Sequence, residues 1–157
     1  GHTIDGLLNM LMKHPYMSKK PPKSTGREDF GENYVQQLLY HYKHEKAEDM
    51  IATLTYFTAK SIAYHYQRDI LPNYPLDKVV IGGGGSHNLT LMNMIRQELS
   101  PIPVYTQDEM GYSSDAKEAI AFVIIGNETL HHHFSNVKSA TGAKEYVILG
   151  NITHKPR

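Results

Sequence analysis

The sequence predicts a helix-rich α/β fold with a short mixed sheet. Its main signature is a β-branched run at 77–81 that leads into four glycines, a helical segment and a second extended run at 104–106. Strand, glycine turn, helix and strand in this order are typical of a βαβ unit. The second observation is a long amphipathic pattern over 47–70. We therefore expect residues 1–75 to be mostly helical and residues 76–157 to form the α/β part.

Three helices are predicted in the first part of the chain. A short apolar pattern at 4–11 predicts the first, which ends where Pro15 disfavours helix in the residue before it. The polar segment 17–30, rich in proline and glycine, predicts an irregular loop. Apolar residues recur on one helix face over 32–42, and the same rhythm fills the long helix before Pro72.

The second part of the chain predicts two further helices. Residues 88–99 carry apolar side chains at helical spacing between the two strands. The segment 114–130 is apolar almost all round, apart from charged residues in its first turns, so we expect this helix to be buried. Residues 131–157 predict a loop, interrupted only by the apolar run 146–149.

Composition narrows the classes of function. The 157 residues are 40% apolar and 20% charged, which is typical of one soluble globular domain. Sixteen basic side chains balance sixteen acidic ones, so we expect neither nucleic acid nor an anionic membrane as a partner. There is no cysteine, which excludes thiolate chemistry and fits a reducing, cytoplasmic environment. The start on Gly1 and His2 without Met indicates a piece of a longer protein.

The clearest candidate site is a run of four glycines directly after the first strand: Gly82, Gly83, Gly84 and Gly85. Such a run lets backbone approach a phosphate or nucleoside where a Cβ would collide, although a bare flexible turn is the alternative. It is not the dinucleotide fingerprint, because His87 stands where the third glycine belongs, and no Walker A lysine follows. Asn88 is expected to cap the next helix, and its side chain could equally face the ligand.

Glu118 is a second candidate, because it lies in an otherwise small and apolar helix. Two interpretations remain open. Either Glu118 caps its own helix together with Ser114, or it points into a cleft, where a carboxylate can hold a hydroxyl or assist proton transfer.

The loop 23–28 packs two cations, two hydroxyls, a glycine and a carboxylate into six residues. Arg27 is suited to bidentate binding of phosphate or carboxylate. The alternative is a solvated loop with an internal pair between Arg27 and Glu28.

Three adjacent histidines at 131–133 suggest a metal only superficially. Adjacent side chains do not converge on one ion without special backbone geometry. We expect a solvated loop there and assign no metal ligand.

Three strings together carry a family resemblance: PPKSTGREDF (21–30), VVIGGGGSHN (79–88) and GYSSDAKEAIAF (111–122). In this order and spacing, the chain resembles the C-terminal part of the anhydro-N-acetylmuramic acid kinase family. That family lies within the superfamily of sugar kinases, Hsp70 and actin. The string SATGAKEYVILGNI (139–152) extends the resemblance over essentially the whole chain.

The resemblance implies a ribonuclease-H-like, actin-like ATPase lobe, here the C-terminal lobe of a two-lobed kinase. The implied reaction phosphorylates 1,6-anhydro-N-acetylmuramic acid with ATP and Mg²⁺ while water opens the anhydro ring. The product is N-acetylmuramic acid 6-phosphate, an intermediate of cell-wall recycling. The resemblance also suggests a homodimer.

Site residues follow from the matching motifs. Gly82 to Gly85 and Asn88 match the run that lies against adenosine and the α-phosphate. Glu118 matches a supporting carboxylate that faces the sugar, and the possible cleft-lining residues are Thr25, Arg27, Glu28 and Asp115.

The chain also departs from the family pattern. The N-terminal lobe is missing, and with it the Asp-Thr-Gly-Pro-Gly-Asn loop whose aspartate is the catalytic base in that family. His131 to Phe134 replace a Gly-Ile-Pro-like loop. We therefore expect the chain to supply the nucleotide-facing half of the kinase and to be inactive alone. The alternative is a non-catalytic nucleotide-binding or structural module.

Overall fold

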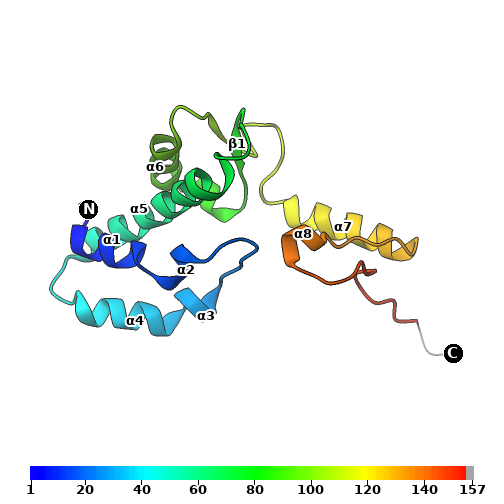
Figure 1. Cartoon of the computed structure of the whole chain (residues 1–157), viewed down its shortest axis with the longest axis horizontal. Helices are drawn as coiled ribbons and strands as arrows, with labels where there is room; N and C mark the ends of the chain where they lie inside the picture. The colour runs from blue at the N-terminus through cyan, green and yellow to red at the C-terminus, as the bar shows by residue number, and fades with distance from the viewer. Residues whose placement is uncertain (155–157) are drawn as a thin grey trace.

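The computed structural model of the chain describes residues 1–154 (Figure 1). Helices make up the first half of the molecule. They are α1 (Asp5–Met12), α2 (Pro15–Ser18), α3 (Arg27–Phe30), α4 (Glu32–His41), α5 (Ala47–His65) and the π-helical turn η1 (Tyr66–Ile70). The long helix predicted over 47–70 is thus confirmed as α5 with its π-helical extension.

The prediction of an irregular loop over 17–30 is wrong at both ends. Pro15 begins α2, because a proline at the first helical position loses no hydrogen bond, and the His14 ring accepts from Tyr16 N at 3.2 Å. Acidic Glu28 and Asp29 lie in the first turn of α3, where the helix dipole favours negative charge. Only the segment between these two short helices is irregular.

A βαβ unit follows the helical half. Strand β1 (Val79–Ile81) leads through the 3-10 turn η2 (Gly84–His87) into α6 (Leu89–Leu99) and then β2 (Val104–Thr106). The two strands are parallel, with Val79 opposite Val104. Among the residues described, the sheet contains only this pair, so the expectation of a mixed sheet is wrong and the α/β class is confirmed.

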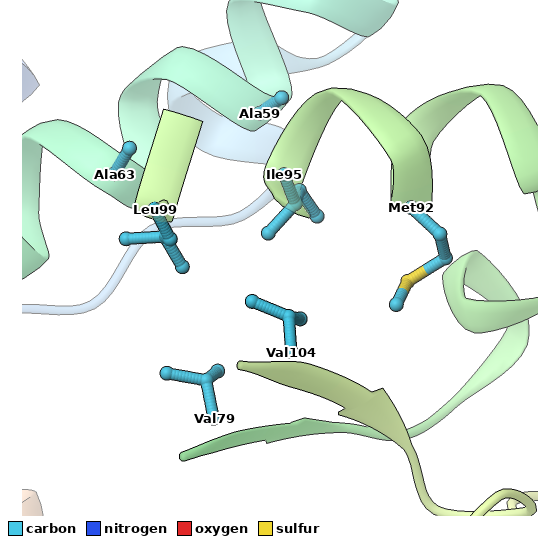
Figure 2. Close-up of a cluster of buried hydrophobic side chains, with 7 residues drawn as sticks. All are labelled: Ala59, Ala63, Val79, Met92, Ile95, Leu99 and Val104. Carbon is cyan, nitrogen blue, oxygen red and sulfur yellow. The ribbon is translucent and has the colours of Figure 1, made fainter. Parts of the chain in front are cut away.

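The main hydrophobic core lies between α5, α6 and the sheet (Figure 2). Small side chains on α5, Ala59 and Ala63, let α6 approach closely, and Ile95 of α6 faces Val79 and Val104 on the strands. A second cluster joins the N-terminal helices to α5 through Leu7, Leu11, Leu38 and Met50. The main core contains Val79 and so positions β1, at whose end the glycine run begins.

The prediction that the helix over 114–130 is buried is wrong. In Figure 1, α7 (Lys117–Leu130) lies apart from the α5–α6–sheet body, followed by the short α8 (Lys138–Thr141). A helix that is apolar all round needs cover on every side, and the described residues leave several large side chains exposed: Ile120, Phe122, Val123, Ile124 and Leu130. Within residues 1–154, no helix has the length and apolarity needed to cross a bilayer.

The apolar run 146–149 forms no regular element. It is held to the preceding loop where Ser135 N donates to Val147 O at 3.3 Å and Val147 N donates to Asn136 Oδ1 at 2.8 Å. Thr129, the buried residue of α7, has Oγ1 within hydrogen-bond distance of two carbonyl oxygens, Ile125 O at 2.8 Å and Leu149 O, which share its one proton.

Candidate functional site

The glycine run forms a sharp turn between β1 and α6. Gly83 has φ +91°, a left-handed conformation that side-chain-bearing residues rarely adopt. Ser86 N then donates to Gly83 O at 2.9 Å, which closes the 3-10 turn. The predicted cap is confirmed, because Asn88 Oδ1 accepts from Leu91 N at 3.1 Å at the start of α6.

The four glycines serve different purposes in the turn. A Cβ on Gly82 would lie 2.0 Å from Gln107 Oε1, so this glycine makes room for a neighbouring side chain. A Cβ on Gly85 would make ordinary contact with Leu91 at 3.7 Å. A Cβ added to Gly83 or Gly84 would have nothing within 4 Å, so these two present bare backbone to open space, where a ligand can approach closely. A role of any of the four in nucleotide binding stays a prediction.

A serine–aspartate network holds the glycine turn against the loop that precedes α7. Ser86 Oγ donates to Gly83 O at 2.7 Å and contacts Ser114 Oγ at 3.4 Å. Ser114 is buried, and its hydroxyl and backbone N–H both donate to Asp108, at 2.6 Å and 3.3 Å. The Ser114 hydroxyl, with a smaller contribution from its N–H, holds the pKa of Asp108 below its ordinary value. The network therefore fixes the position of the turn.

Asp115, predicted as cleft-lining, lies on the outer side of this network. Its carboxylate is exposed and is 3.4 Å from His87 Nε2. Sequence reasoning missed Ser86 and Asp108, although the position of Asp108 just after the second strand was a usable signal, since strand ends are common places for functional side chains.

Glu118 is exposed in the first turn of α7. The capping interpretation is wrong, because Ser114 is bonded to Asp108, and Ser113 Oγ instead accepts from Ala116 N at 3.2 Å. Across residues 1–154, no hydrogen bond engages the Glu118 carboxylate. Its role toward a sugar stays a prediction.

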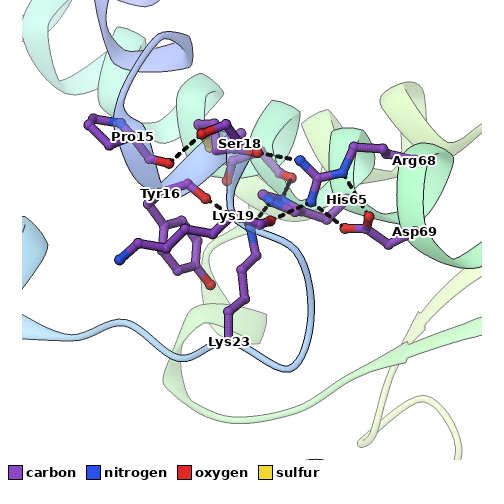
Figure 3. Close-up of polar contacts among 10 residues, drawn as sticks. Pro15, Tyr16, Ser18, Lys19, Lys23, His65, Arg68 and Asp69 are labelled. Atoms are coloured by element: carbon purple, nitrogen blue, oxygen red, sulfur yellow. Dashed lines mark hydrogen bonds and ion pairs between the residues drawn. The ribbon is translucent and has the colours of Figure 1, made fainter.

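The loop 23–28 divides into an anchored and an exposed part. Lys23 Nζ donates to Tyr16 O at 2.9 Å and to His65 Nε2 at 2.5 Å (Figure 3), and Thr25 Oγ1 donates to Asp29 at 2.8 Å. Lys23 and Thr25 also line a cavity. By contrast, Arg27 and Glu28 are exposed, do not line that cavity and form no ion pair with each other in the described structure.

The histidines 131–133 are exposed at the end of α7. His133 Nδ1 lies 3.1 Å from Glu128 Oε2, within hydrogen-bond distance. In the part of the chain from 1 to 154, no group of three or more His, Asp or Glu side chains is placed to hold a metal ion.

Comparison with known proteins supports the motif-based resemblance. The family model described as "Anhydro-N-acetylmuramic acid kinase" matches residues 1–155. A protein of that name from Clostridioides difficile (strain 630) is 59% identical over 156 residues, and one from Bacillus cereus (strain G9842) is 53% identical over 158. Each alignment covers 99% of this chain and 41% of the relative, so the chain spans well under half the length of these proteins. The chain belongs to the anhydro-N-acetylmuramic acid kinase family.

Proposed function

We propose that this chain is the nucleotide-facing part of a kinase that phosphorylates 1,6-anhydro-N-acetylmuramic acid. In that reaction the γ-phosphoryl group of ATP passes to O6 of the sugar, water adds at C1, and the C1–O6 bond breaks. The products are ADP and N-acetylmuramic acid 6-phosphate. The family match over residues 1–155 supports this assignment.

The open face of Gly83 and Gly84 is the observation that carries the proposed nucleotide contact. Backbone without side chains permits adenosine and the α-phosphate to lie directly against the turn. The contact of Ser86 with Ser114 and the hydrogen bonds from Ser114 to Asp108 link this surface to the loop before α7, which supports its conformation before a ligand binds. Asn88 is committed to its cap through Oδ1, and its amide nitrogen is the group left to contact the base or ribose.

Glu118 is the proposed supporting carboxylate for the sugar or the attacking water. Its exposure in the first turn of α7 leaves both oxygens free to accept hydrogen bonds from hydroxyl groups. The aspartate that serves as general base in this family belongs to a motif outside this sequence. Phosphoryl transfer therefore requires the N-terminal lobe, because the in-line position of the attacking and leaving groups is assembled across the cleft between the two lobes.

Mg²⁺ is expected to accompany ATP in the proposed reaction. Near the glycine turn, both Asp108 oxygens accept from Ser114, and the Asp115 carboxylate contacts His87. These residues do not make a ligand set for the ion, so we derive no step through it on this chain.

A chimera tests the proposal. This chain replaces the corresponding C-terminal part of the Clostridioides difficile relative, and ATP-dependent formation of the 6-phosphate is measured with the anhydro sugar. We expect activity in the chimera, a raised KM for ATP in Gly84→Val, and a lowered kcat with little change in that KM in Glu118→Gln. A chimera that folds but forms no product contradicts the proposed reaction. If it still binds ATP, the non-catalytic nucleotide-binding module is favoured instead.

A further inference from the structure

The cavity that Lys23 and Thr25 line lies away from the glycine turn. It has a volume of about 910 Å³ and is lined by α2, α3, α4, α5, η1 and the loop after α2, with α8 at one side. This is within the range of small-molecule sites in proteins, which is roughly 300–1,000 Å³. No residue of 82–88 lines it, so it is separate from the proposed nucleotide contact.

Aromatic rings form a continuous wall in this cavity. The Tyr16 ring lies 6.0 Å from Phe30, and Phe30 lies 5.7 Å from Tyr34 and 6.1 Å from Phe57, measured between ring centroids. Edge-to-face and tilted contacts of this kind hold the rings in fixed positions. Such a wall favours a ligand with an aromatic body, which can make edge-to-face contacts of the same kind with these rings.

Two ammonium groups lie over the Tyr16 ring, and of these only Lys23 lines the cavity, because Lys19 Nζ lies farther off, at 5.8 Å from the ring centroid. Lys23 Nζ lies 4.1 Å from the centroid of the Tyr16 ring. His65 Nδ1 lies 2.7 Å from Ser61 O, to which it donates, so Nε2 carries the lone pair that accepts from Lys23. With Tyr16 O as the second acceptor, two of the three ammonium protons are engaged and one remains for a ligand (Figure 3).

The charge of Lys23 is not balanced by a direct ion pair. The neighbouring Arg68 is paired with Asp69 by two contacts of 2.7 Å, so these two charges neutralise each other. Over the described residues, no carboxylate lies within 4.0 Å of Lys23 Nζ. Burial, together with repulsion from Arg68, lowers the pKa of Lys23, and this outweighs the opposite effect of Asp69, a carboxylate that also lines the cavity and is paired with Arg68.

We propose that this cavity binds a small organic anion with a flat aromatic body, its carboxylate on Lys23 Nζ and its rings against Tyr16, Phe30 and Phe57. The anion supplies the counter-charge that Lys23 lacks, and the apolar body displaces water from the aromatic wall. This site would act in addition to the proposed kinase chemistry and does not depend on it.

Calorimetric titration of the 157-residue chain with 2-naphthoate and its neutral counterpart 2-naphthamide tests the proposal. We expect saturable 1:1 binding, with naphthoate the tighter ligand. Lys23→Met is expected to weaken naphthoate binding about tenfold, which corresponds to one charge-assisted hydrogen bond, and to leave naphthamide unchanged. The matched control is Lys60→Met, since Lys60 lies over Tyr56 on α5 and does not line the cavity.

A second variant separates ligand binding from the structural role of Lys23. Thr58 is exposed on α5 and lines the cavity, so Thr58→Phe places a ring at the cavity edge without disturbing the core and is expected to weaken the binding of both compounds. Thr55→Phe, one turn earlier and outside the cavity, is expected to bind like the wild type. Equal affinity for naphthoate and naphthamide, non-saturable binding, or full binding by Thr58→Phe would each overturn the proposal.

Discussion

Ile95 is one of the side chains that pack α6 against the sheet. It is 1% exposed and faces Val79 and Val104 in the main core (Figure 2). Ile95→Ala removes three carbon atoms, which at about 0.8 kcal/mol each amounts to about 2.4 kcal/mol of lost transfer free energy. The cavity left behind adds to this loss, so we expect the free energy of unfolding to fall by about 3 kcal/mol.

Urea denaturation followed by far-UV circular dichroism measures this loss. With an m value of about 2 kcal/mol/M, a loss of 3 kcal/mol lowers the midpoint by about 1.5 M urea. Ile51→Ala is the control, because Ile51 is 65% exposed on α5, and its truncation is expected to cost less than about 0.5 kcal/mol. An Ile95→Ala variant no less stable than Ile51→Ala would refute the assigned core.

Three further predictions concern stability. The bonds from Ser114 hold the pKa of Asp108 low, so their stabilisation is present above the unfolded pKa and lost as pH falls through the folded one. Urea midpoints of wild type and Ser114→Ala should therefore differ more at pH 7 than at pH 3. Gly83→Ala places a side chain at φ +91° and is expected to cost about 1–3 kcal/mol by thermal unfolding. Tyr56→Phe removes the 2.6 Å bond from Oη to Glu98 between α5 and α6, at a cost of about 1 kcal/mol in the same assay.

Local patterns made the central elements predictable. The long helix and the βαβ unit follow from periodicity and glycine placement, which are properties of neighbouring residues. The short helices α2, α3 and α8 were missed, the last within a segment predicted as loop, because proline or charged residues at a helix start resemble loop composition. The exposure of α7 was not predictable, since an apolar pattern shows that a helix needs cover but not whether the same chain supplies it.

In the candidate site, too, local contacts could be predicted from the sequence and long-range contacts could not. The Asn88 cap was predictable because Asn88 bonds to a residue three positions later. The contact of Ser86 with Ser114 joins residues 28 positions apart and arises only from the fold, so no local sequence pattern predicts it. The difference between Gly82, packed on Gln107, and the open Gly84 likewise depends on what the fold places nearby.

The central claim is that the open backbone at Gly84 contacts a nucleotide. Gly84→Val tests it directly, because the new side chain enters open space and so changes ligand approach without crowding the protein. The measurement is calorimetric titration of the 157-residue chain with ATP and Mg²⁺, with urea midpoints confirming equal stability. The account predicts saturable binding by the wild type and at least about tenfold weaker binding by Gly84→Val. Equal ATP affinity in the two proteins, or no binding by the wild type, would contradict it.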